Sequence, residues 1–471
     1  MKALKKLSWL IIAPLIAGAC GERFLDVKPS QSQRIPASVA DYLALLDNPT
    51  NNNNPMNIRS SHTLGLIGAD EFFITQNQWD AFPTGIQYNY QKNAYTWEQE
   101  IYEGGETGIQ APTDFETGYL RILRSNLVLD GLGKMDVGET ERQDLRLGKG
   151  MALFHRAWNY YNLAQLYCPV YQPSTAAADL GLPLRLTPDP TTQIQRASLA
   201  ATYDRIVADL TESVSLLPPR SEVLFRPSKC AAYALLARVH LQIGDYVQAG
   251  LFADSCLQLQ DRLIDFNGLS VTGNYLFPLY GIGNPEVIFV TAAYNAHIYG
   301  TTRFNADTSL LGAYEEGDLR RAVYFQENNN GRTLFYGSYY GNDWFFTGLA
   351  TDEIYLIRAE CLAREGNLPA ARSDLDHLRK NRISATHFDA LVIDNAEELL
   401  DLIIAERRKE LVLRGTRWED LRRLNREPRY RVELARVLGD RRFELREDSP
   451  RWVWPFPVEA IRAGGYAQNE R

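Results

Sequence analysis

The chain has 471 residues, of which 45% are hydrophobic, an ordinary composition for a folded protein with room for two or three domains or one long helical array. Its formal net charge of −8, without a clustered basic face before the C-terminal third, argues against nucleic acid as a partner. Aromatic residues stand out, because 25 tyrosines and 8 tryptophans exceed what a helical core needs.

The N-terminal residues have the pattern of an export signal. Residues 1–6 contain three lysines, residues 7–19 form an apolar run, and small residues directly precede Cys20. Such a run is too short to cross a bilayer comfortably as a helix. We therefore expect residues 1–19 to be a signal peptide and Cys20 to carry a membrane-anchoring lipid, with residues 20–38 as a tether. Ordinary secretion with an incidental cysteine is the alternative.

Four other cysteines follow, and their spacing fits neither a zinc site nor a disulfide scaffold. We expect buried free thiols in helices. A single bridge between Cys230 and Cys256, near neighbouring ends of one helix pair, remains open.

Predicted helices dominate the chain after a helix over 39–46 that Ser38 caps. Residues 69–108 are expected to be irregular and rich in aromatic residues. Apolar residues at intervals of three and four then predict further helices within 115–128, 145–166 and 199–217.

An internal repeat follows. Residues 230–260 and 351–379 carry Tyr, Ala, Gly and Ala at matching offsets, a pattern typical of tetratricopeptide helix pairs. Small residues are needed where the paired helices cross closely: Ala237, Ala249, Ala359 and Ala371. The predicted fold class is all-α, with tetratricopeptide-type pairs in a right-handed superhelix and long irregular aromatic-rich loops. Residues 145–217 and 403–424 would add degenerate units.

This organisation predicts an N-terminal part over 39–229 and a C-terminal part over 230–471. The C-terminal part contains an inserted loop region, 265–348, in which residues 287–290 favour an extended strand.

No catalytic or metal-binding motif emerges, and no cofactor is expected. The adjacent pairs Asp70-Glu71 and Asp352-Glu353 offer the carboxylates that a glycosidase uses. Solvated surface positions or helix caps are the favoured interpretation of both pairs. The charged run over 406–423 favours a lattice of ion pairs, with Trp418 on its buried side.

The aromatic loops are the candidate binding surface. Sugar rings have apolar faces that stack on flat aromatic side chains, while Asn, Asp and Arg bond the hydroxyl groups. Aromatic walls with a few polar groups are typical of ligand sites. The alternative is that these rings attach the loops to the helices or face a partner protein. The ligand-binding candidates are Trp79, Trp97, Tyr294, Tyr299, Asn305, Tyr339, Asn342, Asp343 and Trp344.

Motifs in order along the chain resemble the SusD/RagB family. Phe24-Leu25-Asp26 follows Cys20, and the early pattern Trp97…Tyr119-x-x-Ile122-x-x-x-Asn126 is similar to that of the family. The most distinctive motifs are Arg156-Ala157, Glu406-Arg407-Arg408-x-Glu410-Leu411, Arg417-Trp418-x-Asp420-Leu421 and Trp454-Pro455-Phe456-Pro457. Arg414 departs from the pattern, because the family usually has an acidic residue there.

The resemblance implies a non-catalytic lipoprotein of the outer membrane that faces the cell exterior. It implies binding of a glycan or oligosaccharide and its delivery to a TonB-dependent (SusC-like) transporter by lid closure, with the membrane contacted through the lipid alone and no nucleic-acid partner. The alternatives are a peptide-capturing member of the same family and a secreted glycoside hydrolase.

Overall fold

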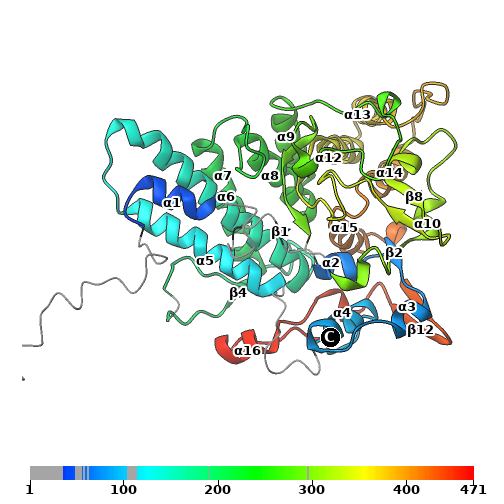
Figure 1. Ribbon diagram of the computed structural model, residues 1–471. Coiled ribbons are helices and arrows are strands. Elements are labelled where there is room, and N and C mark those ends of the chain that lie inside the picture. Colours follow the sequence, from blue (N-terminus) through cyan, green and yellow to red (C-terminus); the bar gives the residue numbers. More distant parts are fainter. Residues whose placement is uncertain are drawn as a thin grey trace, which may run out of the picture.

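The computed structural model describes residues 36–47, 56, 59–60, 63–102, 114–189, 191–293 and 296–471, and this part of the chain is mainly helical (Figure 1). Its α-helices are α1 Val39–Leu46, α2 Thr63–Gly68, α3 Gln76–Asp80, α4 Ile86–Tyr95, α5 Asp114–Gly133, α6 Glu139–Tyr167, α7 Leu199–Leu216, α8 Lys229–Ile243, α9 Tyr246–Leu257, α10 Thr308–Leu311, α11 Arg320–Tyr324, α12 Thr351–Arg364, α13 Leu368–Lys380, α14 Ala396–Glu410, α15 Arg417–Leu424 and α16 Val458–Gly464. Short 3₁₀ turns are η2 Phe266–Gly268, η3 Leu279–Gly281, η4 His297–Tyr299, η5 Pro428–Tyr430 and η6 Pro450–Trp452.

The strands are short and pair only in twos within the described residues. The parallel pair is β1 Arg59–Ser60 with β6 Ala292–Ala293. The antiparallel pairs are β2 Phe72–Phe73 with β7 Asn305–Ala306, β3 Leu180–Pro183 with β4 Arg196–Ser198, β5 Val287–Phe289 with β10 Leu349–Ala350, β8 Phe325–Glu327 with β9 Thr333–Phe335, and β11 Leu434–Leu438 with β12 Arg441–Leu445.

The long helices pack in sequence order. Helix α5 packs on α6, α6 on α7, α7 on α8 and α8 on α9, and α12 then packs on α9, α13 and α14 (Figure 1). The helical repeat signature and the all-α fold class are therefore confirmed. Among the helices of the described part, none is both long enough and apolar enough to cross a membrane.

The two helix pairs recognised in the sequence are α8–α9 and α12–α13. Gly244 and Gly366 make the turns with φ of 78° and 83°, a left-handed conformation that glycine adopts without steric cost. The four alanines predicted at the helix crossings are all fully buried, and the two pairs meet where α9 packs on α12. Small side chains thus allow the close approach on which the array depends.

Two expectations about irregular segments are wrong. Residues 69–108 contain α3 and α4, and the segment 265–348 contains short helices and strands in addition to the expected β5. These elements are too short to show clear periodicity in the sequence. They form because they pair with distant segments, as β2 does with β7 and β5 with β10.

The cysteines confirm the expectation of free thiols. Cys168, Cys230, Cys256 and Cys361 are buried and free. The sulfur atoms of Cys230 and Cys256 lie 3.5 Å apart, so the disulfide bond that the sequence left as an alternative is not formed in this structure.

Candidate ligand-binding site

A short helix presents Trp79 near the surface. The start of α3 is fixed by a capping box in which Thr75 and Gln78 exchange hydrogen bonds between side chain and backbone. Trp79 follows Gln78 directly and is half-buried. The ammonium group of Lys92, on α4, lies 4.2 Å from the centre of the Trp79 ring. This cation–π contact orients the indole.

A segment more than two hundred residues later docks against α3 and α4. The pairing of β2 with β7 places Asn305 opposite Phe73, and Asn305 Nδ2 donates to Gln78 Oε1 at 2.8 Å. The backbone N–H of Ile298 donates to Oε1 of Gln91 in α4 at 3.0 Å. The two aromatic segments singled out in the sequence therefore lie side by side.

Rings from both segments meet at this point. Tyr88 contacts His297 edge to face with a centroid distance of 4.8 Å and lies 6.0 Å from the buried ring of Phe82. The guanidinium of Arg303 is 5.0 Å from the centre of the Phe82 ring. Tyr88 and Arg303 are half-buried, and His297 is exposed.

We call the set Trp79, Tyr88, Lys92, His297 and Arg303 the aromatic junction. Partial burial and the nearby Arg303 lower the pKa of His297 below its usual 6.5. The imidazole is therefore neutral at pH 7 and can both donate and accept a hydrogen bond. The aromatic junction thus combines ring surface with donors and acceptors that reach solvent.

A series of buried rings supports the aromatic junction from beneath. Phe72 contacts Tyr95 at 5.8 Å, Phe304 at 5.7 Å and Tyr299 at 6.2 Å, and Tyr299 continues to Phe345 at 5.3 Å. Aromatic pairs of this kind each contribute about 0.5–1.5 kcal/mol beyond their buried area. This packing holds the two segments in a fixed relation.

A cavity of about 300 Å³ opens beside these rings, between strand β2, the end of α4, the start of α10 and strand β11. Phe73, Tyr95, Trp97 and Asp307 form part of its wall. Val437, which is 60% exposed, lies at its rim. The space adjoins the aromatic junction, because Tyr95 lies 6.1 Å from Trp79.

Four predicted ligand-binding residues are buried in this structure. Trp97 donates from Nε1 to the backbone oxygen of Gly68 at 3.0 Å, and the Tyr339 hydroxyl donates to Glu286 at 2.8 Å. Their contacts attach long segments to the helical body, which was the alternative noted for the aromatic loops. The four are Trp97, Tyr299, Asn305 and Tyr339, each less than 6% exposed.

Trp344 forms a second aromatic surface in the inserted region. Its half-buried ring stacks on Tyr340 with centroids 5.4 Å apart and planes 16° apart, and Tyr280 packs against Tyr340 at 5.3 Å. Asn342 Oδ1 accepts a hydrogen bond from the Trp344 backbone N–H at 2.9 Å, and the neighbouring Asp343 is exposed. Trp79, Asn342, Asp343 and Trp344 keep surface that a ligand could reach, and their role stays a prediction.

Two predicted residues, Cys20 and Tyr294, lie outside the described residues. Of the aromatic junction, only Trp79 is among the predicted ligand-binding candidates; Tyr88, Lys92, His297 and Arg303 are not. The four-residue spacing of Tyr88 and Lys92, one helical turn, was a usable signal, but the segment was taken as irregular.

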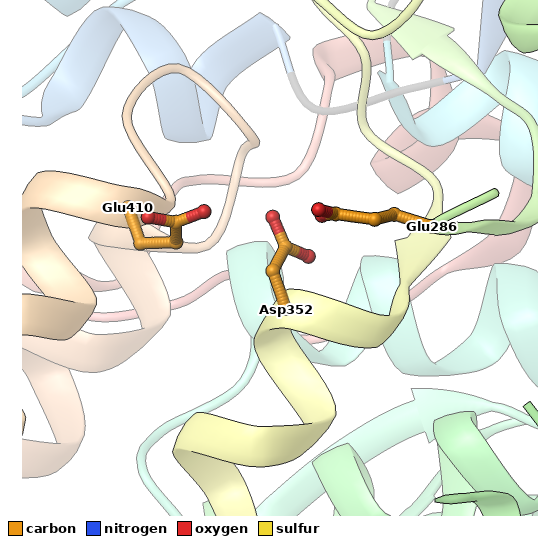
Figure 2. Close-up of side chains that lie close together, drawn as sticks. All are labelled: Glu286, Asp352 and Glu410. Atoms are coloured by element: carbon orange, nitrogen blue, oxygen red, sulfur yellow. The ribbon is translucent and has the colours of Figure 1, made fainter. Parts of the chain in front are cut away.

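Three buried carboxylates, Glu286, Asp352 and Glu410, converge in the helical core with oxygens within 4.8 Å of one another (Figure 2). Arg382 donates to Glu286 and Glu410 at 2.8 Å each, and Arg414 donates to Asp352 at 2.6 Å. Burial, together with the neighbouring carboxylates, raises the pKa of Asp352 to about 7. Because arginines fill the space between these groups, the cluster is a structural ion-pair network. Arg414, the departure from the family pattern, finds its partner in Asp352.

The expectation of solvated surface positions is wrong, because three of the four carboxylates are almost fully buried, whereas the alternative of a helix start holds for Asp352 and Glu353, which lie in the first turn of α12. Asp70 is half-buried and binds Arg417 at 2.7 Å, and Glu353 binds Arg238 at 2.8 Å. The other two carboxyl groups, of Glu71 and Asp352, are also almost fully buried. Arginines distant in the sequence compensate the charges of Asp70, Asp352 and Glu353, which local sequence does not reveal.

The ion-pair lattice predicted over 406–423 is confirmed and lies largely inside the protein. Arg407 donates to Asp420 at 2.7 Å, and Arg423 donates to Glu360 at 2.6 Å. Trp418 is 1% exposed and lies on the buried side, as expected.

Glu71 makes the stability of the protein depend on pH. Its Oε1 accepts from the Leu413 backbone N–H at 2.7 Å, while its buried Oε2 has no hydrogen-bond partner among the described residues. Burial raises its pKa from 4.5 to about 8. Between these values the folded state holds a proton that the unfolded state releases. This group therefore lowers stability as pH rises, by up to about 1.4 kcal/mol per pH unit.

We expect Glu71→Gln to remove this dependence, because glutamine has the shape of the protonated acid. Urea unfolding should show similar stability for the variant and the parent near pH 4.5 and a variant more stable by roughly 2–4 kcal/mol at pH 8.5. The exposed Glu98→Gln is the control and should leave the pH profile unchanged. Parallel profiles for Glu71→Gln and the parent would contradict this account of Glu71.

The fold and the aromatic junction define a helical-repeat protein whose inserted segments carry a partly exposed ring cluster. Residues 23–241 match the family model described as starch-binding associating with outer membrane, and residues 326–457 match that of the SusD family. The chain belongs to the SusD family, as the motifs predicted.

Individual relatives agree with this assignment. SusD-like protein P2 of Formosa agariphila is 26% identical over a compared length of 334 residues; the match covers 58% of this chain and 64% of that protein, less than two thirds of the relative's length. A putative sugar-binding protein from Bacteroides vulgatus has a TM-score of 0.71 at 17% identity, covering 93% of this chain and 99% of that chain. A laminarin-binding SusD-like protein has a TM-score of 0.59 at 17% identity, covering 92% and 96%. At these identities the two structures show a shared fold.

Proposed function

We propose that this protein binds a glycan at the aromatic junction and does not cleave it. The observation that carries the proposal is the meeting of two distant segments in one partly exposed cluster of Trp79, Tyr88 and His297. Ring faces offer stacking surface to the apolar side of a sugar. The neutral His297 offers a donor and an acceptor to sugar hydroxyls.

Binding without cleavage is supported by the state of the carboxylates. Glycoside hydrolysis requires two carboxyl groups that flank the scissile bond. Among the described residues, the clustered carboxylates Glu286, Asp352 and Glu410 are buried and occupied by arginines. Substrate has no access to them in this arrangement.

The proposal extends to location and delivery. Cys20 would carry the lipid that holds the protein at the outer membrane, facing the exterior, and a SusC-like TonB-dependent transporter would receive the glycan when the protein closes over it as a lid. The support is the export pattern that precedes Cys20 and the membership in a family one of whose models is described as associating with the outer membrane.

The test is a binding screen of the full-length protein against neutral and anionic oligosaccharides and against peptides, with product analysis for hydrolysis. We expect glycan binding without products. Trp79→Ala should weaken that binding at least about tenfold, since removing a stacked aromatic side chain costs on the order of 1–3 kcal/mol. The variant Trp344→Ala tests whether the second aromatic surface, around Trp344, also contributes to glycan binding.

Leu251→Ala is the matched control, because Leu251 is 57% exposed on α9, away from the aromatic junction. It should leave affinity unchanged. Binding of peptides alone would favour the peptide-capturing alternative, and cleaved products would favour the hydrolase. Equal glycan affinity in Trp79→Ala would remove the aromatic junction as the site.

A further inference from the structure

Two cations at the aromatic junction lack strong partners. Lys92 Nζ contacts the backbone oxygen of Trp79 only at 3.4 Å. Arg303 makes contacts of 3.3–3.5 Å to His297, Thr302 and Ala81. Its buried Nε has no hydrogen-bond partner in the part of the chain that the structure describes. Charge-assisted hydrogen bonds are normally 2.7–2.9 Å long, so both groups keep unused donor capacity.

More positive charge lies next to these two cations. Arg332 donates to the backbone oxygens of Thr301 and Phe304 at 3.1 and 3.2 Å, which places it beside Arg303. Of the groups whose charge acts on Lys92, Asp80 is acidic and Arg441 is basic. Asp80 is exposed and already accepts a hydrogen bond from Gln76 at 2.6 Å.

In the helical core, by contrast, buried arginines are paired with carboxylates. Arg238, Arg320 and Arg382 each bind at least one carboxylate within 2.8 Å. No carboxylate of the described residues lies within ion-pair distance, 4.0 Å, of Lys92, Arg303, Arg332 or Arg441. In a chain of net charge −8, this leaves a local excess of positive charge at the aromatic junction. Such a patch attracts anions.

We propose that the ligand of the aromatic junction is an anionic glycan, one that carries carboxylate or sulfate groups. The inference rests on the proposed function and narrows its ligand class. One sugar ring would lie against Tyr88 and Trp79, and its acid group would accept hydrogen bonds from Arg303 and Lys92. A guanidinium matches the planar geometry of carboxylate and sulfate oxygens, and an ammonium adds a point charge.

The test compares oligosaccharides of equal length with the full-length protein: neutral laminarioligosaccharides, oligouronates as carboxylate probes, and sulfated galactan fragments as sulfate probes. We expect at least one anionic series to bind at least about tenfold more tightly than the neutral series. Raising NaCl from low to high concentration should weaken the anionic binding, because salt screens exposed charges. Whichever of the two anionic series binds more tightly shows whether the ligand's acid group is a carboxylate or a sulfate.

Lys92→Met and Arg303→Gln should each weaken anionic binding about tenfold and weaken neutral binding less, since each removes a charge, while methionine keeps the apolar stem of the lysine against the Trp79 ring. Arg321→Gln is the matched control, because Arg321 also lies over a ring, that of Phe325, outside the aromatic junction. Circular dichroism and a thermal melt confirm that each variant folds.

The outcomes separate the two proposals. Neutral glycans that bind as tightly as anionic ones, with no effect of Lys92→Met or Arg303→Gln, would overturn the anionic class and leave glycan binding intact. Anionic binding that is equally weakened by Arg321→Gln would also overturn it. No binding of any glycan by the folded protein would overturn both proposals.

Discussion

Replacing Arg382 by methionine is expected to destabilise the protein by about 3–5 kcal/mol or to prevent folding. The guanidinium lies between Glu286 and Glu410, with donor–acceptor distances of 2.8 Å to each, and it also donates to the backbone oxygen of Ile264 at 2.7 Å. Arg382 and both carboxylates are fully buried. Methionine fills much of the volume but leaves two carboxylates short of a counter-charge in a medium of low dielectric constant.

Urea unfolding at pH 7 measures this effect. The control is Arg429→Met, because Arg429 is 45% exposed and its ion pairs with Glu397 and Asp401 are open to solvent, so its loss should cost far less than that of Arg382. Adding Glu410→Gln to Arg382→Met should restore part of the stability by removing one unpaired charge. If Arg382→Met and Arg429→Met have equal costs, the buried network does not hold the core together as described.

Gly348→Ala is expected to cost at least about 3 kcal/mol, because a new methyl group would collide with the backbone. A Cβ at this position would lie 2.0 Å from the carbonyl oxygen of Phe289, on the neighbouring strand β5. The clash cannot be relieved by a rotamer change. Gly348 also accepts a hydrogen bond from the buried Arg238 at 3.1 Å, so a shift of this backbone disturbs the ion-pair network as well.

Gly133→Ala is the matched control for Gly348→Ala. Gly133 ends α5, and nothing lies within 4 Å of the position that a Cβ would take. Alanine has a higher helix propensity than glycine, so this change should be neutral or slightly stabilising. Thermal and urea unfolding of both variants, compared with the parent, test the contrast. A Gly348→Ala protein as stable as Gly133→Ala would show that β5 and β10 separate more easily than their packing indicates.

The helical part of the fold was predictable because its signals are local. Ser38 caps α1 as expected, and Gly244 and Gly366 stand at the turns of the two repeat pairs. Alanines at fixed offsets mark the helix crossings. Each of these features depends on a few neighbouring residues, and each therefore leaves a pattern in the sequence.

The inserted segments were not predictable in the same way. Strand β7 is two residues long and exists because it pairs with β2, more than two hundred residues earlier. The burial of Trp97 and Tyr339 likewise depends on partners that are distant in the chain, Gly68 and Glu286. Composition shows that aromatic residues gather in these segments, but it does not separate rings that support the fold from rings that reach solvent.

The exposure of the acidic residues was mispredicted for a similar reason, because it too depends on partners that are distant in the sequence. Glu71 and Asp352 are acidic residues, for which surface exposure is the ordinary expectation. In the structure both are buried: Glu71 accepts a hydrogen bond from the backbone N–H of Leu413, and Asp352 pairs with Arg414 from the segment between α14 and α15. At the aromatic junction the local excess of positive charge was not predicted, since nothing in the sequence indicated that Lys92 and Arg303 would lie without carboxylate partners.

The most direct test of the account is a crystal structure of the protein with the glycan that binds most tightly in the screen. The account predicts electron density for a sugar ring against Tyr88 and Trp79, with an acid group within about 3 Å of Arg303 or Lys92. Density for the glycan elsewhere on the protein, with the aromatic junction empty, would contradict the assignment of the site.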